Sequence, residues 1–186
     1  MQIYLYPHPI LRHNCKPLVR VNEFVKDKVK EMLDYLHDND SAVGLAASQV
    51  GFPWPLFVTK IPSCPVVINP SIKASNGTSL HYESCLSIPD VELEVRRANT
   101  VQIKGWDLNG DEVNLRLSDF DARVIQHEFD HTIGRLFIEY LPRRKLEKTN
   151  TFDVLVKLKK QFEKSGFDSL QWKETLLERE LLFCQH

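Results

Sequence analysis

Two histidines four residues apart, with a glutamate beside the first, are the residues of this chain best suited to chemistry. They are His127, Glu128 and His131, and they form the pattern H-E-x-x-H. Positions i and i+4 of a helix lie on one face, so both imidazoles can bind the same metal ion. Glu128 then lies where it can take a proton from a metal-bound water. The pattern predicts a metal-dependent hydrolase.

A third protein ligand is needed, because catalytic sites of this kind take three ligands and leave one position for water. Downstream, the segment 132–140 offers only Glu139, and His186 is the last residue. Upstream, Cys85 lies in the stretch HYESCLSIP, and a thiolate is a strong ligand for soft or borderline metals. A lone cysteine is more often a small buried apolar residue. The residues alone therefore leave the choice of third ligand open.

The helix that carries the two histidines should begin at Ser118 and run to about Ile133. Ser118 and Asp121 have the spacing of a capping box, and Gly134 follows as a C-terminal stop. The helix has apolar residues on more than one side, which is typical of a buried helix. These residues are Phe120, Val124, Ile125 and Phe129. We therefore expect the histidines to lie in the interior.

The rest of the chain predicts helices at both ends and strands between them. Asn22 can cap a first helix that runs to about His37, with an apolar stripe that starts at Phe24. A loop of small residues follows at 41–49. Strands are expected at 55–61, 65–70 and 91–97, and a hairpin at 101–117 should turn at Asn109-Gly110. The predicted fold is α+β, with mixed or antiparallel sheets around a central buried helix and with N- and C-terminal helices.

Composition indicates one ordinary globular domain over 1–186, with a C-terminal helical extension after about residue 165. The chain is 42% hydrophobic and 26% charged, and its net charge of −1 indicates neither DNA nor another highly charged partner. No apolar run approaches the roughly 18 residues of a membrane span, and the N-terminus does not resemble a signal peptide. We therefore expect a cytoplasmic protein whose four cysteines are reduced.

Three stretches resemble the motifs of peptide deformylases, in the order typical of that family. They are GLAASQ at 44–49, ESCLS at 83–87 and QHEFDH at 126–131. The resemblance extends over about residues 1–165. At two positions where glycine is usual in the family, this chain has Ala42 and Ser84. We expect these departures to alter the rim of the site or its metal affinity rather than to abolish activity, since no chemical group is missing.

The resemblance implies an activity, a cofactor and a set of site residues. The substrate would be an N-formylmethionyl nascent polypeptide, and formate would be released. Cys85, His127 and His131 would bind one divalent ion, with Fe²⁺ favoured and Zn²⁺ or Ni²⁺ as alternatives. Glu128 would move the proton. The Gln49 side chain and the backbone N–H of Leu86 would stabilise the oxyanion.

The resemblance also implies a binding slot for the methionine side chain. Val43, Phe120 and Val124 would line it, with Glu83 and His127 at its edge. Gly44 would let the peptide backbone approach closely, because it has no side chain. In the neighbourhood of the ligands, Gln126 and Asp130 could hold the imidazoles or nearby backbone.

The segment 143–164 carries eight basic and three acidic residues, and could therefore contact ribosomal RNA. A solvated amphipathic helix packed on the sheet would show the same pattern.

Two other functions fit part of the pattern. An endopeptidase using H-E-x-x-H would take its third ligand downstream and leave Cys85 without a role. A non-catalytic metal-binding or ribosome-associated relative would have no need to keep Glu128 or Gln49, and both are present.

Overall fold

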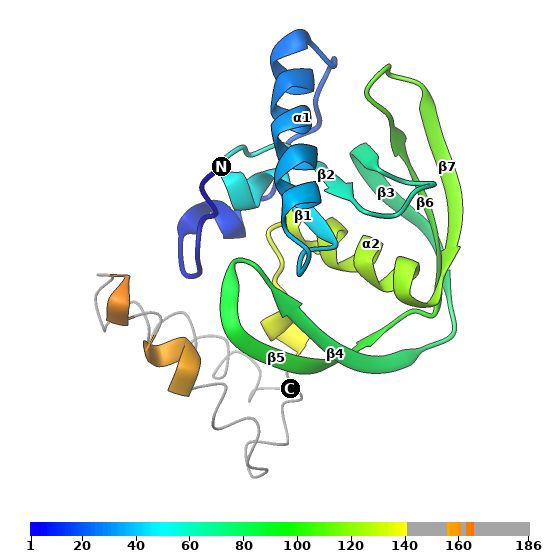
Figure 1. Ribbon diagram of the computed structural model, residues 1–186. Coiled ribbons are helices and arrows are strands. Elements are labelled where there is room, and N and C mark those ends of the chain that lie inside the picture. Colours follow the sequence, from blue (N-terminus) through cyan, green and yellow to red (C-terminus); the bar gives the residue numbers. More distant parts are fainter. Residues whose placement is uncertain (141–155, 161–162, 166–186) are drawn as a thin grey trace.

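The computed structural model describes residues 1–140, 156–160 and 163–165 (Figure 1). Its fold is α+β, as the sequence predicts. Within residues 1–140 the α-helices are α1 (Glu23–Asp38) and α2 (Asp119–Thr132), and the short 3-10 helices are η1 (Pro9–Arg12), η2 (Ala47–Val50) and η3 (Phe137–Tyr140). The described residues 156–160 are also helical. The predicted C-terminal extension after about residue 165 lies outside the described residues. No helix in the described part of the chain is long and apolar enough to cross a membrane.

Among the residues that the structure describes, seven strands form two antiparallel sheets. The larger sheet has the order β1-β2-β3-β6-β7, with β1 at Gly44–Ala46, β2 at Leu56–Thr59, β3 at Val66–Asn76, β6 at Thr100–Trp106 and β7 at Glu112–Ser118. The smaller sheet is the hairpin of β4 (Ser79–Cys85) and β5 (Ile88–Arg97). Figure 1 shows α2 in the middle of the molecule, between the larger sheet and the curved β4–β5 hairpin. This arrangement brings a strand and a helix distant in sequence to one place.

Helix α1 covers the larger sheet with one apolar face. The side chain of Asn22 accepts a hydrogen bond from the backbone N–H of Val25, which confirms the predicted cap. Phe24 is an exception to the predicted apolar stripe, since it is 54% exposed. The residues of α1 that are buried in the core are Val25, Val29, Met32 and Leu36.

The predicted end of strand β3 at a proline is wrong. We expected a strand to stop at Pro70, but β3 continues to Asn76. The register between β3 and β6 shifts between Ile68 and Ser71, and Asn69 within this shift has a φ of 52°. A bulge leaves its extra residues out of the ladder, so a proline there removes no ladder hydrogen bond. The predicted hairpin of β6 and β7 is confirmed, with Gly110 at positive φ in its turn.

Both ends of α2 lie within one residue of the prediction, but its predicted capping box is wrong. Ser118 precedes the helix and its side chain makes no capping hydrogen bond. The chain enters α2 directly from β7, where Ser118 still pairs with Thr100, and Asp119 then adopts a φ of 56°. Gly134 ends the helix at a φ of 70°, and a Cβ there would lie 2.4 Å from the carbonyl oxygen of Arg12.

The predictions about buried residues agree only in part with the described structure, because His127 and Phe129 are half-buried. Most of the α2 residues that we expected in the interior are buried, including Val124, Ile125 and His131, whereas Phe120 is exposed. The three described cysteines, Cys15, Cys64 and Cys85, are free and buried.

Candidate active site

The end of β4 and the middle of α2 bring three metal-binding side chains together. One ligand atom each from Cys85, His127 and His131 lies within 4.8 Å of the other two. Cys85 Sγ lies 3.3 Å from His131 Nε2. Glu139, the downstream alternative, pairs instead with Arg12 and accepts a hydrogen bond from the backbone of Leu136.

Two buried polar atoms of the site have no hydrogen-bond partner in the described structure: Glu128 Oε2 and His131 Nδ1. An unpartnered buried carboxylate oxygen is unfavourable and calls for an ion, a water molecule or a substrate beside it. One thiol and two imidazoles are a donor set that suits a divalent transition metal. The residues present therefore fit such an ion.

His127 is held by a carboxylate on the side away from the cysteine. Its Nδ1 lies 3.0 Å from Glu83 Oε2, which leaves Nε2 for the metal. Burial alone would raise the pKa of Glu83, but hydrogen bonds and charges from His127 and Arg97 lower it to about 2. Glu83 is therefore an anion that orients the ring of His127.

The two histidines have opposite pKa shifts. Burial lowers the pKa of His131 well below 6.5, so this ring is in the neutral form that binds metals. Burial also opposes charge on His127, but contacts with Cys85 and Glu83 raise its pKa well above 6.5. Metal binding at Nε2 would therefore release a proton from His127.

Glu128 has the properties of a residue that exchanges protons near neutral pH. Burial raises its pKa to about 7, and the neighbouring Glu83 carboxylate adds to the shift while His127 opposes it. A general acid or base works best when its pKa lies near the operating pH.

The side chain of Gln49 is fixed with its amide nitrogen directed at the cysteine. Its Oε1 accepts a hydrogen bond from the backbone of Ala46 at 2.9 Å, and its Nε2 donates to Ser87 Oγ at 3.1 Å. The same nitrogen lies 3.4 Å from Cys85 Sγ. Leu86 follows Cys85 directly, in the tight turn between β4 and β5.

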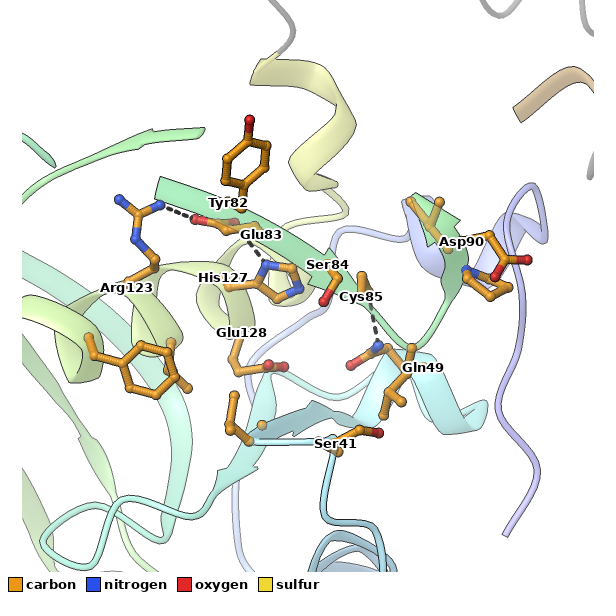
Figure 2. Close-up of a pocket in the computed structure, with 18 residues that line it drawn as sticks. Ser41, Gln49, Tyr82, Glu83, Ser84, Cys85, Asp90, Arg123, His127 and Glu128 are labelled. Atoms are coloured by element: carbon orange, nitrogen blue, oxygen red, sulfur yellow. Dashed lines mark hydrogen bonds and ion pairs between the residues drawn. The ribbon is translucent and has the colours of Figure 1, made fainter. Parts of the chain in front are cut away.

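A pocket of about 460 Å³ opens onto these groups (Figure 2). It is lined by Cys85, His127 and Glu128, whereas His131 is not among its lining residues. The other residues that we predicted for the site all line it: Val43, Gly44, Gln49, Glu83, Leu86, Phe120 and Val124. Phe120 and Val43 are 62% and 38% exposed, so they lie towards the mouth, whereas Val124 is buried.

The two departures from the family motifs, Ala42 and Ser84, also line this pocket. Of the two residues expected near the ligands, Gln126 bonds the backbone of Ala98, and Asp130 bonds Arg97 and Tyr140.

Two arginines beside the site were not singled out from the sequence. Arg97 and Arg123 are buried and both bond Glu83. The sequence did indicate that Arg97 is buried. Arg97 continues the alternation by which Val91, Leu93 and Val95 point inwards along β5. A charged residue at an inward position indicates a buried partner.

Comparison with known proteins decides the family. The family model described as Polypeptide deformylase matches residues 1–147. The chain belongs to the peptide deformylase family. As a peptide deformylase, it is a hydrolase that removes the N-terminal formyl group from N-formylmethionyl nascent polypeptides and releases formate. Peptide deformylases depend on a metal, and Cys85, His127 and His131 form the candidate metal site.

Individual peptide deformylases support the assignment in sequence and in structure. The protein from Rhodopirellula baltica is 41% identical over 145 residues, which cover 75% of this chain and 72% of that protein. The crystal structure from Thermotoga maritima matches with a TM-score of 0.72 at 35% identity, covering 76% of this chain and 97% of that one. The structure of the Plasmodium falciparum enzyme in complex with an inhibitor matches with a TM-score of 0.77 at 31% identity. The match covers 87% of this chain and 99% of that one. These findings favour a deformylase over an endopeptidase or a non-catalytic relative.

Proposed function

We propose that Cys85, His127 and His131 bind one divalent metal ion, and that Glu128, Gln49 and Leu86 carry out deformylation beside it. The observation that supports this proposal most strongly is the convergence of one thiol and two imidazoles within 4.8 Å, next to the unpartnered Oε2 of Glu128. When bound, such an ion polarises a carbonyl and lowers the pKa of a bound water to about 7. We favour Fe²⁺, while Zn²⁺ and Ni²⁺ suit the same ligands.

Glu128 is proposed to move the proton in both directions. With a pKa of about 7, its carboxylate can accept a proton from the attacking water. It can then donate the proton to the amine nitrogen as the C–N bond of the formamide breaks. General acid–base catalysis of this kind typically contributes about 10²–10⁴-fold.

Gln49 and Leu86 are proposed to stabilise the oxyanion that forms on the formyl oxygen. Gln49 lines the pocket, and its Nε2 donates towards Cys85 Sγ at 3.4 Å, next to the proposed metal site. The backbone N–H of Leu86 comes from the adjacent turn. Each donor of this type is typically worth about 2.7–4 kcal/mol.

The apolar part of the pocket is proposed to bind the methionine side chain. Val124 and Phe120 lie about one and two turns before His127 on the same helix, and Val43 lines the same pocket. Gly44 lets the peptide pass close to this wall, and Glu83 lies at its edge. An apolar slot favours a substrate with a long unbranched side chain over one without a side chain, because more apolar area is removed from water.

Three further predictions stay with this proposal. The chain is expected to form one domain over 1–186 and to work in the cytoplasm. Binding to the ribosome through the basic segment 143–164 is proposed from its charge alone. Most of that segment lies outside the described residues.

The test is formate release by anaerobically purified protein, with metal analysis of the same sample. A formyl-Met peptide should be deformylated much faster than a formyl-Gly peptide of otherwise identical sequence. Equal rates would remove the methionine slot from the proposal. Absence of formate from protein with a full complement of metal would overturn the proposed roles of the catalytic residues.

A further inference from the structure

Four buried charged side chains lie between the β4–β5 hairpin and α2, beyond the proposed ligands. Glu83, Arg97, Arg123 and Asp130 are each no more than 7% exposed. Their formal charges balance, with two carboxylates and two guanidiniums. Removing charged groups from water is unfavourable, and such networks are weak evidence for stability. A role in positioning neighbouring groups therefore explains the network better than stability does.

Two members connect the two elements of the site: Arg123 of α2 donates directly to Glu83 Oε1, and Arg97 contacts a carboxylate on each element. Arg97 Nε and Nη2 donate to the two oxygens of Glu83, both at 2.9 Å, and its Nη1 donates to Asp130 Oδ2 at 2.5 Å. Glu83 lies two residues before Cys85 on β4, and Asp130 directly precedes His131 on α2. One planar guanidinium therefore bridges the strand that carries the thiol and the helix that carries the imidazoles.

The bridge continues to the other imidazole through Glu83. Glu83 Oε2 accepts from Arg97 Nη2 and also lies 3.0 Å from His127 Nδ1. Because Arg97 holds both oxygens of this carboxylate, it sets the direction from which the carboxylate meets the ring. Tyr140 closes the far side: its ring centroid lies 4.5 Å from the guanidinium carbon, and its hydroxyl donates to Asp130 at 3.0 Å.

We infer that Arg97 is a positioning residue of the metal site, which holds Cys85 at the correct separation from His127 and His131 before the ion binds. Arg97 is not among the residues that line the pocket, and it would act through Glu83 and Asp130. The fork geometry is essential to this role, because a lysine ammonium cannot hold one carboxylate with two parallel bonds while reaching a second. The inference rests on the proposed ligand set.

The experiment measures the affinity of the full-length protein for Co²⁺ by competition with a chromophoric chelator. The absorption spectrum of the bound Co²⁺ reports thiolate ligation independently of activity. The variants are R97M and R97K. The matched control is R96M, which changes the neighbouring arginine of β5, an exposed residue. Removing a partner that orients a ligand typically weakens metal binding about 10–100-fold.

We expect R97M to bind Co²⁺ at least about 10-fold more weakly than wild type, with an altered thiolate-to-cobalt band. R97K should also lose affinity for Co²⁺, because lysine keeps the positive charge but cannot form the two parallel hydrogen bonds to Glu83. R96M should match wild type. Wild-type affinity and spectrum in R97M, or in R97K, would overturn the inference. If R97M does not fold, R97K decides by the same criterion.

Two further variants separate the possible failures. If Arg97 acts through Glu83, the affinity loss of R97M/E83Q should be smaller than the product of the two single losses. A loss equal to that product would contradict the relay. Cys85→Ser tests the ligand set itself. If Cys85→Ser loses the ion and R97M keeps it, the inference about Arg97 fails alone, whereas retention of the ion by Cys85→Ser would mean that the proposed ligand set is wrong.

Discussion

Replacement of Gly44 by alanine should damage the proton-transfer step rather than metal binding. A Cβ built on Gly44 would lie 2.4 Å from Glu128 Oε1, 2.7 Å from Cδ and 2.8 Å from Cγ. The backbone of Gly44 does not have a positive φ, so alanine fits the local conformation. The new methyl group must therefore push against the carboxylate of Glu128.

The size of the effect follows from these distances. Ordinary contact begins at 3.4 Å, so the 2.4 Å approach to Oε1 is about 1 Å too short. Glu128 is buried among packed groups, and its carboxylate must move by roughly that amount. A misplacement of about 1 Å in a catalytic group can reduce the rate about 10²-fold. We therefore expect kcat to fall by up to about 10²-fold, with the metal content unchanged.

The assay is formate release from a formyl-Met peptide, with kcat, KM and metal content measured on one preparation. Gly110→Ala is the control, because a Cβ there meets nothing within 4 Å. That variant has a positive φ, so it should lose some stability and keep its kcat. Gly44→Ala should add no further loss of kcat in the Glu128→Gln background. A normal kcat in Gly44→Ala, or a loss confined to KM, would refute the reasoning.

Three other results are expected. Glu128→Gln should keep its metal and lose about 10²–10⁴-fold in kcat, and full activity would remove its role in proton transfer. Gln49→Ala should lose about 10²–10³-fold in kcat with little change in metal affinity, and an unchanged kcat would exclude it as an oxyanion donor. Glu83 should make stability pH-dependent: its pKa is about 2 in the folded protein against 4.5 ordinarily, so its contribution is present above pH 4.5 and is lost as the pH falls towards 2. In urea unfolding of metal-free protein, the stability difference between wild type and Glu83→Gln should therefore shrink between pH 5 and 3, and a constant difference would contradict the shift.

Much of the fold could be predicted because its signals are local. The cap at Asn22, the turn at Gly110 and the stop at Gly134 each depend on a few neighbouring residues. The errors arose where distant contacts override a local preference. Pro70 does not end β3, because a bulge accommodates it, and Ser118 does not cap α2, because it still belongs to a strand.

The site residues also fall into those that local sequence predicts and those that depend on distant contacts. The spacing of His127, Glu128 and His131 places them together on a helix, so the sequence shows them directly. Cys85 lies 46 residues from His131, and only the packing of the β4–β5 hairpin against α2 brings their atoms within 3.3 Å. Without the family resemblance, the third ligand stayed open for this reason. Arg97 was missed because its partners lie on β4 and α2, and its inward position was the single local sign of them.

The most direct test of the central claim is the metal content of Cys85→Ser beside wild type, each purified anaerobically and reconstituted with Co²⁺. Wild type should bind about one ion per chain, with a thiolate-to-cobalt absorption band. Cys85→Ser should lose that band and most of its affinity while remaining folded. One tightly bound ion in Cys85→Ser, or a wild-type spectrum without thiolate character, would contradict a site built from this thiol and the two imidazoles of α2.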